Sequence, residues 1–270
     1  MKAFHRTARS ENRRPNSARR AGGFALLAAC AVIFSILALA PALASAPHEA
    51  GADAGSSAPV FSTPEDAVSH FCQALAANDF EMALEACAVR EQAEDFNFPG
   101  YVDRMKMHML FANPAPSTSG LYRDLNEAAL LGNFANQIKT LSYSFFVTKG
   151  LDGIPVTPAD RAYAEAFEEA VDPKKLAGLK LLRVDPPVKS ILESAKNVEN
   201  FGKMARLYGA EEMTERIALY ELEGRTFMGG FGLYRYASGW KICRLNSILA
   251  GLSATGAAVE TTAQQYAGML

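Results

Sequence analysis

Apolar residues recur at helical spacing in Ser62–Val89, the stretch with which the foldable part of the chain begins. Thr63, Pro64 and Asp66 supply an N-cap, a proline for the first helical position and an acidic side chain able to bond back to the cap. The apolar stripe is interrupted at residues 78–79 and then resumes. The pattern predicts two short amphipathic helices, which need a partner surface because short helices are unstable alone in water.

The middle of the chain has mainly helical patterns. Leu121–Leu141 is the longest of them, and its many apolar positions predict a central, well-buried helix. Residues 142–148 either extend this helix or form a strand. Other helices are expected at residues 101–111, 158–171 and 188–208, with a strand at residues 179–184 that ends before two prolines.

The last third of the chain alternates with a period of two, which is typical of strands. Strands are predicted at Thr214–Leu222, Arg225–Tyr236 and Trp240–Asn246. Residues 223–224 fit a two-residue turn, and residues 237–239 fit a three-residue loop with glycine in the left-handed position. These segments together predict an antiparallel β-meander.

Pairing through those turns divides the side chains between two faces of the sheet. One face is apolar and should meet the helices; it contains Tyr220, Leu222, Phe227, Phe231, Leu233, Cys243 and Leu245. The other is aromatic and amphipathic, and contains Ile217, Leu219, Met228, Tyr234, Tyr236, Trp240, Ile242 and Arg244. Glycines at positions 229, 230 and 232 predict a bulge or a sharp coil. A curved sheet with helices in its concavity would enclose a pocket.

The first 46 residues have the pattern of an export signal. A basic stretch, residues 1–20, precedes the apolar run Phe24–Leu43, and small residues form an A-x-A-like cleavage site that ends at Ala46. We therefore expect an exported protein, periplasmic, extracellular or envelope-associated, with the signal peptide cleaved near Ala46. Two alternatives place the protein on the membrane: an uncleaved leader that spans it, or a lipid on Cys30.

Composition divides the chain into a signal peptide (1–46), a flexible linker (47–60), one domain (61–252) and a loose tail (253–270). Seven of the 27 Lys and Arg and one of the 29 Asp and Glu lie in the leader. The rest of the chain thus holds 20 basic and 28 acidic residues, a net charge of −8. This balance argues against a nucleic-acid partner, because phosphate binding needs clustered positive charge.

Three cysteines follow the leader, and export permits disulfides. Cys72 and Cys87 lie on either side of residues 78–79, so in an antiparallel helix pair they could face each other and form a disulfide. The alternative is that both of them, and Cys243, are small buried apolar residues. No C-x-x-C or H-E-x-x-H motif occurs, so the sequence predicts neither a metal site nor a cofactor.

A helix pair led by TPEDAVSHFCQALAANDFEMAL and a meander that ends in LYRYASGWKI resembles the NTF2-like superfamily. The sequence looks closest to uncharacterised exported bacterial proteins of that type. The resemblance covers the first helices and the last strands, about half of the domain. It implies an α+β cone, with N-terminal helices packed on a curved C-terminal antiparallel sheet and an enlarged helical middle. Members include isomerases, dehydratases, cyclases and binding modules, so the fold does not choose a function.

No catalytic motif of the superfamily matches this sequence, so we assign no catalytic residue. The candidates for lining a ligand pocket are Tyr101, His108, Tyr143, Tyr234, Trp240 and Arg244. We expect a non-enzymatic domain that binds a small apolar ligand or a protein partner in the cell envelope. The alternatives are an isomerase- or dehydratase-like enzyme that uses the same pocket, and a self-associating module that forms a homodimer.

Overall fold

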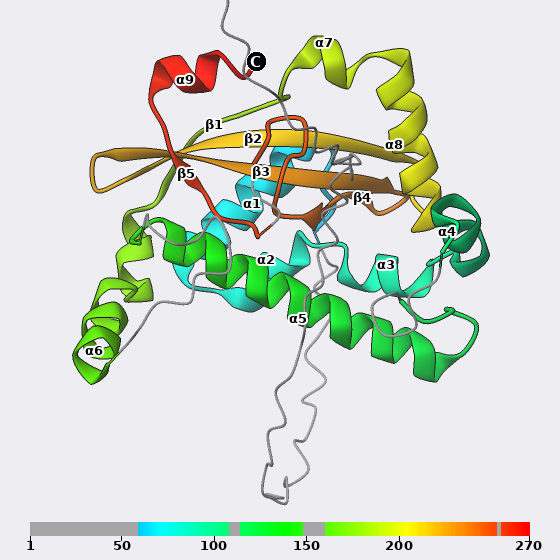
Figure 1. Ribbon diagram of the computed structural model, residues 1–270, viewed down its shortest axis with the longest axis horizontal. Coiled ribbons are helices and arrows are strands. Elements are labelled where there is room, and N and C mark those ends of the chain that lie inside the picture. Colours follow the sequence, from blue (N-terminus) through cyan, green and yellow to red (C-terminus); the bar gives the residue numbers. More distant parts are fainter. Residues whose placement is uncertain (1–58, 108–113, 148–159, 253–254) are drawn as a thin grey trace, which may run out of the picture. The chain divides into compact units, whose positions relative to one another are not determined.

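An antiparallel sheet with helices packed against it forms the centre of the protein (Figure 1). The computed structural model describes residues 59–107, 114–147, 160–252 and 255–270, which belong to one structural unit, Gly55–Leu270. The helices in these ranges are α1 (Pro64–Ala77), α2 (Phe80–Glu85), α3 (Val89–Glu94), α4 (Phe98–Met105), α5 (Gly120–Ser144), α6 (Arg161–Ala170), α7 (Lys189–Leu192), α8 (Ala195–Leu207) and α9 (Ala263–Ala267), with a 3-10 helix, η1, at Pro173–Gly178. The strands are β1 (Lys180–Asp185), β2 (Glu212–Leu222), β3 (Arg225–Tyr236), β4 (Gly239–Arg244) and β5 (Val259–Glu260). Helices therefore precede a C-terminal antiparallel sheet, as predicted for an α+β fold.

The predicted helix pair is confirmed, and its caps explain where each helix begins and ends. Thr63 Oγ1 accepts a hydrogen bond from the Asp66 backbone at 3.1 Å, and the Asp66 carboxylate accepts one from the Thr63 backbone. Asn78 ends α1 in the left-handed conformation with a φ of 55°, and Asp79 caps α2. Caps of this kind satisfy backbone groups that helix ends leave free, and each contributes about 1 kcal/mol.

The strands follow the order β1-β2-β3-β4 and are antiparallel throughout. On β3, residues 232–236 pair with β4, and residues 227–228 pair with β5. Both residues of the predicted two-residue turn between β2 and β3 have a positive φ, 51° and 75°. That conformation matches the twist of the flanking strands, so the turn sets the register of this hairpin.

The side chains of β4 lie on other faces of the sheet than predicted, because the turn between β3 and β4 is one residue shorter than expected. Gly239 pairs with Tyr236, which leaves a two-residue turn in place of the predicted three-residue loop. The slip of one residue turns Trp240 and Ile242 to the helix side of the sheet, where both are buried. Cys243 is then the extra residue of a bulge, and it packs on the opposite face.

The glycines of β3 make room for neighbouring chain, which explains the irregularity predicted there. A Cβ atom on Gly230 would lie 2.4 Å from the backbone nitrogen of Ser247. One on Gly232 would lie 2.7 Å from the Arg244 side chain. The segment that follows β4 therefore crosses directly over β3, and only glycine permits so close an approach.

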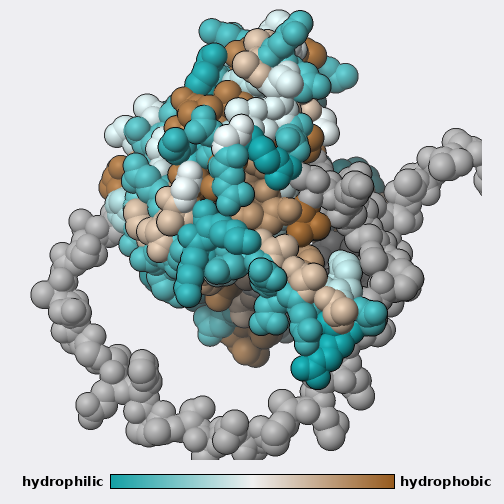
Figure 2. Space-filling view, turned by 90° about the vertical axis from the view of Figure 1, so that its left-hand side faces the viewer, coloured by the Kyte–Doolittle hydropathy of each residue, from teal (hydrophilic) through white to brown (hydrophobic). Residues whose placement is uncertain are grey.

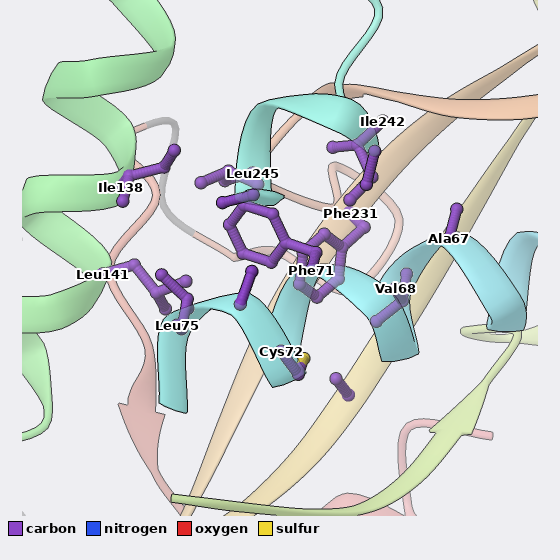
Figure 3. Packing of buried hydrophobic residues seen from close by; sticks show 14 of the residues in the cluster. Ala67, Val68, Phe71, Cys72, Leu75, Ile138, Leu141, Phe231, Ile242 and Leu245 are labelled. Atoms are coloured by element: carbon purple, nitrogen blue, oxygen red, sulfur yellow. The ribbon is translucent and has the colours of Figure 1, made fainter. Parts of the chain in front are cut away.

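The helix-facing side of the sheet packs against α1 and the second half of α5 (Figure 3). Phe71 of α1 meets Phe231 of β3 edge to face, with ring centroids 5.8 Å apart. At the end of α5, Phe145 contacts Tyr220 and Phe227 in the same way, at 5.5 and 5.3 Å. Side chains thus fill this face of the sheet, where the sequence led us to expect a pocket.

The large apolar side chains of α5 are buried only in its second half, which corrects the prediction of a central buried helix. Leu121 and Leu125 are 65% and 54% exposed, whereas Phe134 and Leu141 are each 1% exposed. The helix has 25 residues, so at a rise of about 1.5 Å per residue it is about 38 Å long. Its first half lies beside α3 (Figure 1).

The C-terminal segment packs on the sheet, so the prediction of a loose tail is wrong for residues 255–270. Tyr266 of α9 is 1% exposed, and its hydroxyl donates a hydrogen bond to Asp185 Oδ2 at 3.0 Å. Its ring packs with Ile217 and Met228 on the face of the sheet opposite α1. The Ala- and Gly-rich composition suggested a loose tail. The segment is instead held on the sheet by the buried Tyr266 side chain and by the pairing of β5 with β3.

The helix predicted over residues 188–208 is divided into α7 and α8. Val188 has a φ of 37° before α7, and the chain leaves helical conformation at residues 193–194 before α8 begins. Gly209, with a φ of 69°, follows α8 as predicted. Around α6 and the β2–β3 hairpin, hydrophilic and hydrophobic residues are interspersed (Figure 2), as on an ordinary solvated surface.

We predict that Gly230→Ala lowers the free energy of unfolding by about 3 kcal/mol, because the methyl group would overlap the backbone of Ser247. Gly132→Ala is the control: its position on α5 has no atom within 4 Å, and alanine should stabilise the helix by up to about 1 kcal/mol. Urea unfolding followed by circular dichroism measures both. Equal stability of the two variants would contradict the close crossing over β3.

Candidate functional site

A cavity of about 620 Å³ lies beside β4, between the first half of α5 and the end of α8. Its walls also include parts of α3, β3 and residues 114–115. Leu130 and Met204 belong to its apolar lining, and Asn126 and Arg244 to its polar lining. The lining is polar and apolar in about equal parts, and a hollow of this size with a few fixed polar groups can hold a small molecule.

Tyr208 and Tyr234 form an aromatic wall of the cavity. Their rings stack with centroids 5.6 Å apart and 26° between the ring planes. Burial raises the pKa of Tyr208 to about 12 and raises the pKa of Tyr234 above its ordinary value. Both phenols are therefore neutral at physiological pH. Tyr234 is only 3% exposed, so Tyr208, which is partly exposed, supplies most of the accessible aromatic surface.

Arg244 is the charged group of the cavity, and a carboxylate behind it holds it in place. Its Nη2 donates to Glu215 Oε1 at 2.5 Å, and Glu215 is 0% exposed. The Arg244 side chain keeps 21% of its surface exposed. Its Nε lies over Gly232 and has no hydrogen-bond partner among the described residues. The pair brings donor groups to the cavity wall while the two charges offset each other.

Glu215 also fixes the segment that follows β4. Its carboxylate accepts a hydrogen bond from Ser247 Oγ at 2.6 Å, and others from the backbone N–H groups of Ile248 and Leu249 at 3.2 and 3.0 Å. With Arg244, four donors satisfy the two oxygens of a charge that would be costly to bury alone. The crossing segment is therefore held against β2 as well as over β3.

Buried polar side chains of α5 hold three other parts of the chain, and none of them was predicted. Asn126 accepts from and donates to the backbone of Ala115, both at 2.8 Å. Gln137 accepts from the N–H that follows β4 at 2.7 Å, and Ser144 accepts from the N–H before β5 at 2.8 Å. Their spacings of 11 and 7 residues are close to whole helical turns, so the three share one face of α5. That regular polar spacing within an apolar run is the signal that identifies them.

Two of the predicted pocket residues, Tyr234 and Arg244, line this cavity together. The alternation of the strands placed both on the sheet face opposite α1, and that placement is confirmed. Trp240 was predicted beside them but belongs to the packed core, because the shorter turn before β4 reverses its direction.

The other predicted pocket residues lie elsewhere. Tyr101 is in α4, with its ring 5.5 Å from that of Phe96. Tyr143 lies near the end of α5, and its ring meets that of Phe167 edge to face at 5.2 Å. Neither lines the cavity. His108 lies outside the described residues. Helical spacing alone does not show which of two neighbouring elements a side chain will meet.

Cys72 and Cys87 are both free and buried, so the disulfide predicted between them is not formed. The reason is that α2 ends at Glu85, and Cys87 lies beyond it in a bridge with Ile242 of β4. The Cys72 thiol instead points at the Tyr220 hydroxyl, 3.9 Å away. The alternative prediction, that these are small buried apolar residues, agrees with the structure.

The cavity offers groups for binding but none prepared for acid–base chemistry. Its tyrosines are neutral, its arginine is paired, and partial burial raises the pKa of the Cys243 thiol to about 12. Within the described ranges, no group of three or more His, Cys, Asp and Glu is placed to hold a metal ion. No helix in those ranges is both long and apolar enough to cross a membrane.

Comparisons with known proteins bear on the fold. No family model and no curated protein matches the chain. A crystal structure of a cystatin-like protein from Ruminococcus gnavus matches it with a TM-score of 0.50 and 17% sequence identity. The match covers 78% of this chain and 43% of that one, so it spans less than half of the other protein. The likeness shows the fold. The arrangement of helices followed by a C-terminal antiparallel sheet is that of a cystatin- or NTF2-like α+β cone.

Replacing Glu215 by alanine should lower the free energy of unfolding by about 4 kcal/mol, because Arg244 and the donors of the crossing segment lose their partner. The control is Glu221→Ala, also on β2, whose surface ion pair with Lys180 contributes less than about 1 kcal/mol. Urea unfolding measures both, and limited proteolysis at residues 246–252 reports release of the segment. Similar stability of the two variants would contradict the role given to Glu215.

At pH 8 we expect iodoacetamide to leave Cys72, Cys87 and Cys243 unlabelled in the folded protein, because burial raises all three thiol pKa values. All three should be labelled after unfolding without a reductant, as mass spectrometry of tryptic peptides will show. Since each folded pKa lies above the unfolded value, the stability these thiols contribute is complete below about pH 8.5 and is lost as the pH rises beyond it. Recovery of an unlabelled pair of tryptic peptides joined through Cys72 and Cys87 would contradict the free thiols and show that the disulfide forms.

Proposed function

We propose that this chain is an exported, non-enzymatic binding domain whose cavity beside β4 takes a small, mainly apolar ligand. The cavity itself carries the proposal: about 620 Å³ of space, lined by the stacked Tyr208–Tyr234 pair and by Arg244. An apolar body would lie on the rings and on Met204, and a single carbonyl or carboxylate would meet the guanidinium. Polar groups at fixed positions in the lining, Arg244 and Asn126 among them, would orient such a ligand.

The walls of the cavity are held in place by contacts behind them, which supports binding. Asn126 joins residues 114–116 to α5 through two backbone hydrogen bonds. Gln92 of α3 donates to the Ala88 carbonyl at 2.8 Å, and Glu215 holds Arg244. A site that is formed before the ligand arrives loses little conformational entropy on binding, and this favours affinity.

The enzyme alternative has less support. It needs an Asp, Glu or His at the floor of a pocket, with a tyrosine within hydrogen-bond reach. The described residues that line the cavity include none of these three types. Glu215 lies behind Arg244, and four donors already occupy its oxygens. We therefore propose binding in preference to catalysis.

Export and superfamily membership are further parts of the proposal. The basic stretch and apolar run of residues 1–46 support cleavage near Ala46 and a location in the cell envelope. A retained leader or a lipid on Cys30 would instead hold the same domain at the membrane. We also propose that the α+β cone belongs to the NTF2-like superfamily. The capped helix pair and the meander support this assignment.

The homodimer alternative has one observation in its favour. Leu121 and Leu125, one helical turn apart at the start of α5, are 65% and 54% exposed, and the neighbouring Tyr122 is 43% exposed; adjoining exposed apolar side chains are typical of an interaction surface. A self-associating domain would cover them. Sedimentation velocity distinguishes the cases, since a protein that stays monomeric at high concentration has no such interface.

Filling the cavity should remove binding without unfolding the protein. Ala129 of α5 lines the cavity, and Ala129→Trp should weaken binding of 8-anilinonaphthalene-1-sulfonate, an apolar aromatic anion, by at least about tenfold. Ala128→Trp is the matched control, because the neighbouring position is also exposed and does not line the cavity. Fluorescence titration measures the affinity of the probe.

Native mass spectrometry of the purified protein gives a second measurement. Any small molecule that co-purifies should be carried by the wild type and by Ala128→Trp, and lost from Ala129→Trp. Equal affinity of all three proteins for the probe would contradict binding in this cavity. So would a wild-type protein that neither carries a small molecule nor binds the probe.

A further inference from the structure

Strand β1 forms one margin of the sheet, because the order β1-β2-β3-β4 gives it a neighbour on one side only (Figure 1). Within the described ranges, no strand pairs with its other side. Leu182 is 44% exposed, and the side chains of Lys180 and Arg183 keep 68% and 54% of their surface exposed. An accessible strand edge of this kind is a surface with which another strand can pair.

The turn between β2 and β3 shows which backbone groups of β1 point to this edge. The turn closes on Leu222–Arg225, which is a hydrogen-bonded pair, so the even-numbered residues of β2 bond to β3 and the odd-numbered ones bond to β1. The partners of those odd-numbered residues on β1 are Lys180, Arg183 and Asp185. The N–H and C=O groups of Leu181 and Val184 therefore point away from the sheet, and no hydrogen bond within the described ranges uses them.

A bulge in β1 makes these two outward-pointing residues equivalent. The register against β2 shifts between Leu181 and Arg183, so Leu182 is an extra residue. Leu181 and Val184 consequently lie three residues apart and still pack against the same core, on the helix-facing side of the sheet. If a second copy of β1 runs antiparallel with Leu181 opposite Val184, each such pair exchanges two backbone hydrogen bonds and keeps its side chains on one face.

The charged ends of β1 are complementary in the same register, which sets Lys180 opposite Asp185 of the second copy. Both side chains lie on the face opposite α1, where Lys180 pairs with Glu221 at 3.0 Å and Asp185 accepts from Tyr266 at 3.0 Å. Asp185 also accepts from Arg183 at 2.9 Å. A carboxylate can accept about four hydrogen bonds, so it has room for the lysine as well.

Space for a second strand lies between α1 and the start of β1. A hollow of about 370 Å³ is lined there by Leu181 and by Ser69, Gln73 and Ala76 of α1. A strand added to a sheet lies about 4.8 Å from its neighbour. Val184 of a second copy would therefore enter this hollow beside Leu181, and two apolar side chains would cover each other.

We propose that β1 pairs with β1 of a second copy of this chain. The two strands run antiparallel about a two-fold axis between Leu182 and Arg183, so the two sheets join into one. In this register the strand sequence KLLRVD is complementary to itself, with a cation opposite an anion at each end and an apolar pair next to it. The interface uses neither the exposed start of α5 nor the cavity beside β4, so it does not rest on the proposed ligand binding.

The test measures hydrogen exchange of backbone amides in the purified, ¹⁵N-labelled protein at micromolar and at millimolar concentration. The amides of Leu181 and Val184 should exchange freely in the dilute protein and become protected in the concentrated one, in which sedimentation equilibrium should show a dimer. The amides of Arg183 and Asp185, which face β2, should be protected in both. A protein that stays monomeric at millimolar concentration would overturn the proposal, and so would a dimer in which Leu181 and Val184 stay unprotected.

A charge reversal tests the register. Lys180→Glu sets a carboxylate opposite Asp185 at both ends of the pairing, and should weaken self-association by at least about tenfold at low salt. The side chain makes only a surface ion pair with Glu221, so the variant keeps the fold. The matched control, Lys174→Glu on the exposed surface of η1, should associate as the wild type does.

Lys180→Arg keeps the charge and should also associate as the wild type does. Unchanged association of Lys180→Glu would overturn the proposal. So would a dimer that Leu125→Glu removes and Lys180→Glu leaves intact, because the start of α5 would then be the interface.

Discussion

The buried carboxylate of Glu215 is the interaction on which the rest of the structure depends. It lies in the first half of β2 and receives four donors from the end of β4 and the segment beyond. That segment crosses the sheet over Gly230 and Gly232, where any larger residue would collide with it. The same carboxylate holds Arg244 at the wall of the candidate cavity. Since a buried charge is tolerated only when its donors are all in place, folding of the sheet and formation of the site are coupled.

The side chains that cover the two faces of the sheet decide where a ligand could bind. α1 and the end of α5 fill the helix-facing side with aromatic and aliphatic groups. On the other side, α8 and the C-terminal segment cover β2 and β3. Space remains at the margins, beside β4 and beside the first residues of β2. The candidate cavity beside β4 is lined by aromatic rings and by one cation that a buried carboxylate holds in place.

Much of the fold was predictable from local patterns. The caps at Thr63 and Asp79, the β2–β3 turn and the strands β2 and β3 agree closely with the sequence-based expectations. The candidate site was predictable only in part: Tyr234 and Arg244 were identified, whereas Tyr208, Asn126 and Glu215 were not. Asn126 and Glu215 are polar residues that a pattern assigns to solvent. Their burial depends on partners far away in the chain, such as Ser247, which sequence spacing does not reveal.

The sequence by itself determined where α1 and α2 begin and how the β2–β3 hairpin turns, because caps, prolines and tight turns act over a few residues. It also determined the apolar face that meets α1. Only the tertiary structure decided the direction of Trp240, where one residue fewer in a turn exchanges the faces of β4. It likewise decided that the first half of α5 is exposed, that Cys72 and Cys87 stay apart, and that the C-terminal segment packs through Tyr266. Each of these depends on contacts between distant segments, and those contacts exist only once the chain has folded.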